Sequence, residues 1–227
     1  MWEFAPQDLL PLIRRDRDLR GEVLKTEGNY LVVRFNHPRP PFDRPTIRPR
    51  YTDAEAKTAL ENSGYRGEKI VQISPADYPD VRAANEVLAG LLKRIGINLE
   101  YISVDWSTMT QRVVRKDKPE AGGFHIHMLN VPCLPVASPM VNSRPRGTGS
   151  DESGWYTSAR HEEPRGAWLL SETPEEQRKP AEALQRECQE SVPLVPCGVT
   201  MQPAAWRAGL DGVLPGVPKF WNVRRSG

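Results

Sequence analysis

The chain has 227 residues, enough for one sizeable globular domain or two small ones. Hydrophobic residues make up 38% and charged residues 26%, so a core can form, and no run approaches the roughly 18 consecutive apolar residues of a membrane span. The formal net charge of +2 argues against a dedicated nucleic-acid-binding protein, which normally carries a basic face.

Prolines and cysteines add limited information. The 22 prolines are scattered and predict that much of the chain is loop. Cys133, Cys188 and Cys197 form neither a CxxC motif nor an even set, which argues against a disulfide framework or a zinc ribbon. Two alternatives remain for these cysteines: a Cys188–Cys197 disulfide, or three partly buried thiols. The first residues, Met1 to Pro6, show no secretory signal.

The amino-terminal elements are short. Residues 22–36 favour two strands around a turn at 27–29, as in a hairpin. Residues 37–49 hold five prolines and predict an extended connector. A helix is predicted to start after Thr52, which with Glu55 has the spacing of a capping box, and to stop at Gly64.

The most regular pattern lies between residues 69 and 104. Residues 69–74 alternate as a strand, residues 80–95 have apolar positions at helical spacing, and residues 97–104 alternate again. A strand–helix–strand crossover of this length predicts two parallel strands. A second helix is expected from Ser107 to about Val114, with cap chemistry at Asp105.

The rest of the chain gives weaker predictions. Residues 124–129 predict a short strand, followed by a long proline-containing loop. Helical patterns cover residues 162–170 and 174–191, the second with a proline at its first position. Residues 193–201 predict a core strand interrupted by Pro196. The tail from 209 to 223 is apolar enough to dock on the fold.

Two patterns suggest chemistry. His125 and His127 share one face of the predicted strand, with Cys133 nearby, which is a legitimate spacing for metal ligands. The alternative is that these residues face a groove or solvent. Residues 147–154 match neither a nucleophile elbow nor a phosphate loop, and no acid–base constellation stands out, so enzymatic activity is not expected.

Aromatic residues in irregular segments are candidates for a ligand groove, because Trp and Tyr offer an apolar face and a hydrogen-bonding edge. The candidates are Trp106, Phe124, Trp155, Tyr156, Trp168, Phe220 and Trp221, several of which lie next to glycines or in irregular segments. Alternatively, they cover the core of a small, proline-rich domain.

Several segments together resemble the family 5 extracytoplasmic solute-binding proteins, the peptide, oligopeptide and nickel receptors of bacterial ABC importers. Asn36 with Pro40-Pro41-Phe42-Asp43-Arg44-Pro45 and Ile47-Arg48 resembles the hinge signature of that family. Residues 64–71, 86–97 and Asp105-Trp106 resemble its second lobe, and residues 212–214 and 220–223 resemble its return crossing. The likeness covers the carboxy-terminal part of a full receptor.

Two departures from the family pattern accompany the resemblance. A helical segment of several dozen residues normally follows the hinge motif, and here it looks deleted between Arg48 and Thr52. His125 and His127 follow Phe124 where an acidic residue and aromatics are usual, which puts capture of a peptide amino terminus in doubt.

The resemblance implies an α/β fold, the second lobe of a two-lobed periplasmic-binding-protein-like structure, with a mixed sheet, a βαβ unit and flanking helices. It implies a hinge and first-lobe remnant at 1–50, a solute-binding lobe at 51–200, and a return segment at 201–227. The implied function is partial substrate binding for an ABC importer of peptides or similar solutes, in the periplasm, with a membrane permease as partner and no cofactor.

The expected ligand-binding residues are Asn36, Phe42, Trp106, Phe124, His125, His127 and Trp155. An exposed apolar face where another lobe would lie also predicts self-association. The alternative function is a small metal-binding protein or metal-dependent enzyme that uses His125, His127 and Cys133.

Overall fold

In the computed structural model the chain forms two compact units. The small unit comprises residues 1–31, 131–134 and 198–227, and the large unit comprises residues 32–130 and 135–197. The structure describes residues 9–23, 28–39, 53–142, 145–150, 154–201, 203–215 and 221–226. The predicted connector from residue 40, the Thr52 cap and most of the hinge motif therefore lie outside the described residues.

The small unit is built from short elements around two strand pairs. Its elements are α1 (Leu10–Arg15), β1 (Leu19–Glu22), β7 (Ala204–Arg207), β8 (Leu210–Asp211) and β9 (Arg224–Arg225). β1 pairs antiparallel with β7, and β8 pairs antiparallel with β9. The buried side chain of Ile13 on α1 packs against Ala205 of β7.

The hairpin predicted at residues 22–36 is wrong. β1 ends at Glu22 and pairs with β7, whereas β2 (Asn29–Phe35) lies in a different sheet. The physical reason is that β7 offers three buried residues, Ala204, Ala205 and Trp206, as a distant apolar partner. A turn signal in the local sequence carries no information about that partner.

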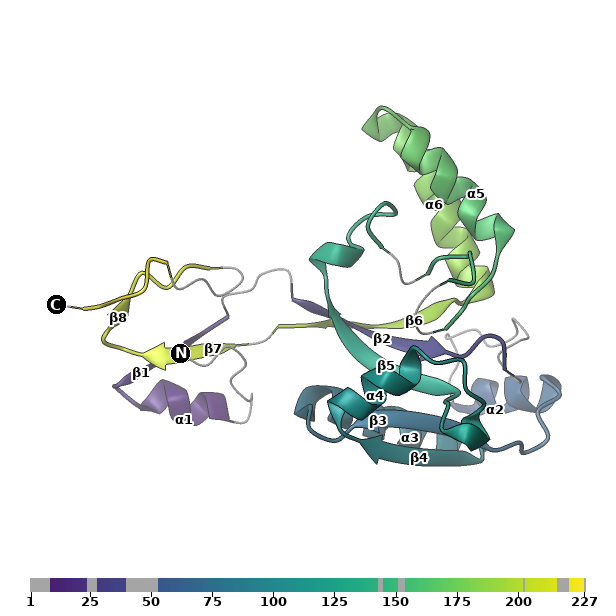
Figure 1. Ribbon diagram of the computed structural model, residues 1–227, viewed down its shortest axis with the longest axis horizontal. Helices are drawn as coiled ribbons and strands as arrows, with labels where there is room; N and C mark the ends of the chain where they lie inside the picture. The colour runs from purple at the N-terminus through teal and green to yellow at the C-terminus, as the bar shows by residue number, and fades with distance from the viewer. Residues whose placement is uncertain are drawn as a thin grey trace. The chain divides into compact units, whose positions relative to one another are not determined.

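The large unit is organised around a five-stranded sheet with the strand order β4-β3-β5-β2-β6 (Figure 1). The further strands are β3 (Ile70–Pro75), β4 (Leu99–Val104), β5 (Ile126–Pro132) and β6 (Leu194–Thr200). β3 is parallel to both β4 and β5. The predicted parallel strand–helix–strand unit is therefore confirmed, with α3 (Pro79–Arg94) as the crossover helix.

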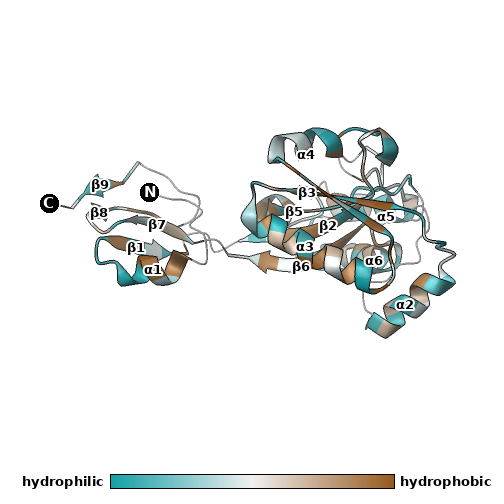
Figure 2. Cartoon of the chain, turned by 90° about the horizontal axis from the view of Figure 1, so that it is seen from below, coloured by the Kyte–Doolittle hydropathy of each residue, from teal (hydrophilic) through white to brown (hydrophobic). Residues whose placement is uncertain are grey.

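Two helices cover opposite faces of this sheet. Successive side chains of a strand point to opposite faces. On β3, Val71 and Ile73 pack with Met109 of α4 (Trp106–Val113), whereas Gln72 donates a hydrogen bond to Asn85 of α3. Figure 2 shows hydrophobic residues concentrated along the strands, with hydrophilic and hydrophobic residues mixed along the helices.

The remaining helices follow the predicted pattern. α2 (Asp53–Asn62) ends two residues before Gly64, whose φ of 79° is the left-handed conformation typical of glycine after a helix. α5 (Ala159–Leu170) starts three residues earlier than predicted, because Ser158 caps it. α6 (Pro174–Ser191) begins with the predicted Thr173 cap, completed by Glu176 as a capping box. The short 3-10 turns are η2 (Pro119–Ala121) and η3 (Leu134–Val136).

β6 differs from the predicted core strand. It lies at the edge of the sheet next to β2, and its residues from Pro196 to Val199 are exposed. An edge position explains how Pro196 fits, since proline cannot donate a hydrogen bond to a further strand.

All three cysteines are free thiols, so the Cys188–Cys197 disulfide is not formed. Within the described part of the chain, no helix is both long and apolar enough to cross a membrane.

A buried polar cluster joins the start of α5 to the end of α6. Ser158 accepts a hydrogen bond from the backbone N–H of His161 and donates one to Glu187. The Nδ1 atom of His161 lies 3.7 Å from the sulfur of Cys188, and burial raises the pKa of that thiol to about 11. Cys188 is therefore a neutral thiol at physiological pH.

We expect this cluster to make stability depend on pH. Burial lowers the pKa of His161 below its ordinary value of 6.5, although Glu162 and Glu187 oppose the shift. The unfolded chain then binds more protons than the folded chain, so the free energy of unfolding falls as the pH drops below 6.5. Urea unfolding between about pH 7.5 and about pH 5 should show a smaller fall in His161→Gln. If the free energy of unfolding falls equally with pH in His161→Gln and in the wild type, His161 is not the source of the pH dependence. Some pH dependence should remain in the variant, because burial also lowers the pKa of His125.

Candidate functional site

Trp106 lies at the carboxyl end of the parallel strands. It is the first residue of α4, directly after β4, and its half-buried ring stacks on Tyr78, with the ring centroids 5.3 Å apart and an angle of 30° between the planes. Tyr78 precedes α3, which follows β3. In open α/β sheets, ligands bind outside the carboxyl ends of the strands. The stacked pair is therefore the candidate binding surface of the large unit.

Hydrogen bonds fix the backbone that carries this pair of aromatic rings. The backbone N–H of Trp106 donates to Asp77 over 2.8 Å, which ties the loop after β3 to the start of α4. Asp105 caps α4 by accepting from both the backbone N–H and the hydroxyl of Thr108. The Thr108 hydrogen bonds lower the pKa of the Asp105 carboxyl, which keeps the cap charged. The rings are thus presented on a well-anchored backbone.

Asn36 and His125 lie near the other end of β3. The side-chain amide of Asn36 donates to the carbonyl of Phe124, and its backbone N–H donates to the carbonyl of His125, both over 2.8 Å. His125 Nδ1 accepts a hydrogen bond from the backbone N–H of Val71 over 2.9 Å. All of these residues are buried. Asn36 and His125 therefore connect β2, β3 and the start of β5.

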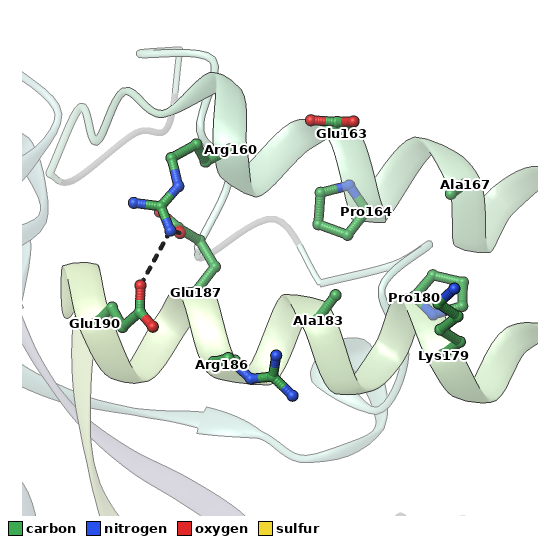
Figure 3. A pocket seen from close by; sticks show the side chains of 10 residues that line it. All are labelled: Arg160, Glu163, Pro164, Ala167, Lys179, Pro180, Ala183, Arg186, Glu187 and Glu190. Carbon is green, nitrogen blue, oxygen red and sulfur yellow. Dashed lines mark hydrogen bonds and ion pairs between the residues drawn. The ribbon is translucent and has the colours of Figure 1, made fainter.

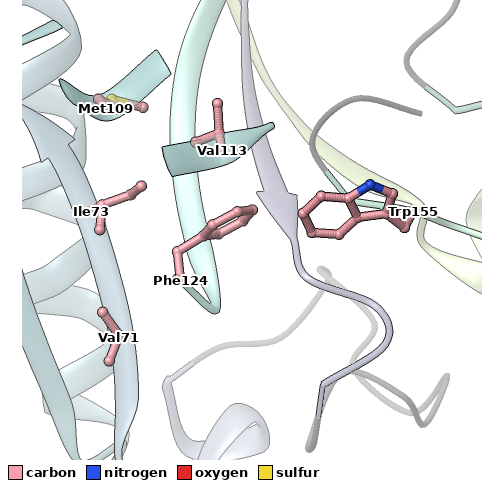
Figure 4. Packing of buried hydrophobic residues seen from close by; sticks show 6 residues of the cluster. All are labelled: Val71, Ile73, Met109, Val113, Phe124 and Trp155. Atoms are coloured by element: carbon pink, nitrogen blue, oxygen red, sulfur yellow. The ribbon is translucent and has the colours of Figure 1, made fainter. Parts of the chain in front are cut away.

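Phe124 and Trp155 belong to the hydrophobic core of the large unit (Figure 4). Phe124 is 0% exposed and Trp155 is 7% exposed. Their ring centroids lie 6.1 Å apart, and the Lys116 ammonium lies 5.6 Å from the centroid of the Trp155 ring. The φ of Trp155 is 51°, a conformation that non-glycine residues seldom adopt. The structure gives both residues a packing role, and their contact with a solute stays a prediction.

His127 is also fully buried, with its ring edge-on to Phe124 at a centroid distance of 4.9 Å. Among the residues that the structure describes, no group of three or more His, Cys, Asp or Glu side chains is placed to hold a metal ion. The structure thus offers no support for the metal alternative built on His125, His127 and Cys133. Phe42 lies outside the described residues.

The predicted site is therefore divided. Asn36, Phe124, His125 and Trp155 come together near the start of β3, whereas Trp106 lies beyond the last paired residues of β3 and β4. Tyr78 was missed by sequence reasoning. Its position between a strand and the crossover helix could have indicated it, since the loops after neighbouring parallel strands meet at the same edge of a sheet.

Comparison with known proteins identifies the class of fold. No family model matches the chain. A probable peptide ABC transporter periplasmic-binding protein from Sinorhizobium fredii, y4tO, is 27% identical over 269 residues, which covers 97% of this chain and 51% of that relative. The alignment is longer than the chain itself, so the relative holds several dozen residues without a counterpart here. Their number is similar to the several dozen residues that look deleted after the hinge motif.

Solved structures show the same partial coverage. The dipeptide-binding protein of Pseudoalteromonas sp. SM9913, in complex with Met-Leu, has a TM-score of 0.78 and 18% identity, over 97% of this chain and 53% of its own. DppA of Helicobacter pylori, in complex with the peptide STSA, has a TM-score of 0.80 and 12% identity, over 99% and 52%. NikA of Staphylococcus aureus, in complex with Ni(L-His)2, has a TM-score of 0.74 and 15% identity, over 93% and 53%.

These likenesses define the fold as that of part of a periplasmic binding protein. The chain spans about half the length of the curated relative and of the solved structures that it matches. The predicted α/β fold class is confirmed. The resemblance to the family 5 peptide- and nickel-binding receptors, as a partial chain, is confirmed as well.

Proposed function

We propose that this chain is a partial substrate-binding component of an ABC importer that takes up peptides or similar small solutes. The observation that carries the proposal is the stacked Tyr78–Trp106 pair at the carboxyl ends of β3 and β4, in a chain with the fold of peptide-binding proteins. Such an aromatic surface suits the side chains and backbone of a short peptide. In this proposal the chain acts in the periplasm and delivers its solute to a membrane permease.

In this proposal, three consecutive segments of the chain have different roles. Residues 1–50 provide the hinge and a remnant of the first lobe, residues 51–200 the solute-binding lobe, and residues 201–227 the return segment. Two-lobed receptors close on a solute because closure adds contacts that exist only in the closed state. A single binding surface makes only part of those contacts, so we expect weak binding once the entropy of association is subtracted.

Substitution of Trp106 tests the proposal. Native mass spectrometry of the purified protein should detect a co-purified solute, and titration with a dipeptide mixture up to about millimolar concentration should give a saturable signal. Trp106→Ala should weaken binding about 10- to 100-fold, because a central aromatic contact contributes about 1.4–2.8 kcal/mol. It should change stability little, since the ring is only half-buried.

Trp221→Ala is the matched control, because this tryptophan is 85% exposed and belongs to the small unit. It should leave the dissociation constant for the dipeptide mixture unchanged. The same apparent dissociation constant of the wild type and Trp106→Ala for the dipeptide mixture, or no saturable binding by the wild type, would refute the proposed role of the Tyr78–Trp106 surface.

A further inference from the structure

The helical hairpin formed by α5 and α6 has an uncovered face. The two helices pack against each other and extend away from the sheet of the large unit (Figure 1). Of the residues in these two helices, all of which the structure describes, only His161 and Glu187 are buried, and both lie at the base of the hairpin. Leu170 at the tip is 85% exposed. A helix pair normally buries one face along its length, whereas among the described residues only α5 and α6 themselves line this one.

One side of α5 is already covered by the chain itself. Arg165 donates hydrogen bonds to the carbonyls of Pro139 and Met140, and Glu162 accepts one from the backbone N–H of Gly147. Glu162 and Arg165 are three residues apart and share one face of α5. The residues Arg160, Glu163, Pro164 and Ala167 lie on the opposite face, where they line a groove between the helices.

This groove has a volume of about 470 Å³ and a floor of small side chains (Figure 3). Pro164 and Ala167 of α5 and Pro180 and Ala183 of α6 form the floor. Small floor residues allow a second pair of helices to approach closely. Because the floor has no bulky apolar group, the charged residues on its rim decide what can cover it.

The two rims of the groove carry different charges. At the base, Arg160 forms ion pairs with Glu190 at 3.0 Å and with Glu187 at 3.3 Å, so its charge is compensated within the hairpin. Farther along, the α5 rim presents Glu163, whereas the α6 rim presents Arg186 and Lys179. The free charge of the α5 rim is therefore acidic and that of the α6 rim is basic.

We propose that the groove is covered by the same groove of a second copy of this chain, so that two hairpins form a four-helix bundle. The helices of one hairpin are antiparallel, and Arg160 lies level with Glu187 and Glu190. Glu163, three residues along α5, is level with the turn of α6 that runs from Ala183 to Arg186 (Figure 3). A two-fold axis parallel to the helices places α5 of one copy on α6 of the other, and so sets Glu163 against Arg186 of the second copy twice.

The expected dimer is modest in affinity. α5 is about 18 Å long and α6 about 27 Å long, which gives an interface at the small end of specific protein contacts. Association should therefore depend on concentration. This proposal is independent of the proposed transport function, because its test involves no solute.

Sedimentation velocity of the full chain over a concentration series tests the dimer. The wild type should shift from monomer to dimer as its concentration rises. Glu163→Lys and Arg186→Glu should each raise the dissociation constant about tenfold or more, because each sets like charges against one another. The double variant that carries both substitutions should regain the wild-type dissociation constant, since it reverses both members of the pair.

The matched control is the double variant Arg178→Glu with Glu182→Lys. These two residues form an ion pair on α6, are 83% and 64% exposed, and do not line the groove, so the dissociation constant should not change. A wild type that stays monomeric at all concentrations would mean that a different molecule, or another part of a longer chain, covers the groove. That result overturns the proposal, as does a dimer that is indifferent to Glu163→Lys or is not restored in the double variant. Circular dichroism checks that each variant is folded.

Discussion

Replacing Phe124 by alanine should lower the free energy of unfolding by about 3–5 kcal/mol. The ring is 0% exposed and lies among Val71, Ile73, Met109 and Val113 (Figure 4). Removing it therefore loses the burial of a large apolar group and leaves a cavity that β3 and α4 can only partly fill. Since domains of this size are stable by about 5–15 kcal/mol, the variant should be close to unfolding.

Urea unfolding monitored by circular dichroism measures this loss, and Leu170→Ala provides a matched truncation. Leu170 is 85% exposed at the end of α5, so its replacement should change the free energy of unfolding by no more than about 0.5 kcal/mol. A loss below about 1 kcal/mol for Phe124→Ala would be incompatible with a core position and would favour the groove-lining role predicted from the sequence. Comparison with Trp106→Ala then separates the two roles, because Trp106→Ala should affect binding more than stability.

The parallel unit β3–α3–β4 was predictable because its signals are local. Apolar spacing in α3, the alternation on both sides of it and the glycine after it all lie within one short stretch of sequence. The capping box at Thr173 was predictable for the same reason, since its two partners are three residues apart.

The elements that sequence reasoning placed wrongly depend on distant partners. β1 lies before the large unit in the sequence and β7 lies after it, so their pairing joins distant segments of the chain. The local turn pattern pointed to a hairpin instead. The exposed edge position of β6 likewise follows from the strand order and not from its own apolar composition. Hydrophobicity shows that a segment can be buried, whereas its neighbours decide whether it is.

The candidate site shows the same limit at the level of side chains. Trp106 was identified from its motif, but its stacking partner Tyr78 comes from a different loop and became evident only with the sheet in place. Phe124 was selected as an aromatic of the strand predicted at residues 124–129, and Trp155 as an aromatic in a loop; both patterns are shared by groove residues and core residues. Asn36 was selected from the hinge motif, and its hydrogen bond to the carbonyl of Phe124 gives it a structural role that the motif does not reveal.

Gly123→Ala should also destabilise the protein strongly, by about 1–3 kcal/mol or more. A methyl group on Gly123 would collide with the backbone carbonyl of Asp117, which a change of side-chain rotamer cannot relieve. The same segment is fixed by hydrogen bonds from the Gly123 N–H to the Lys118 carbonyl and from Arg112 to the Gly123 carbonyl. Relief of the collision would therefore shift the backbone directly before Phe124 and disturb the core.

Gly90→Ala is the control of opposite sign. Gly90 lies inside α3, and a methyl group there would meet no heavy atom within 4 Å. Alanine should therefore stabilise the helix by about 0.5–1 kcal/mol, because it loses less backbone entropy on folding than glycine does. Urea unfolding of both variants measures the difference. If both variants change the free energy of unfolding equally, the close approach of residues 117 and 123 does not hold Phe124 in place. If Gly123→Ala destabilises the protein while Gly90→Ala stabilises it, the packing of this core depends on the conformation of Gly123.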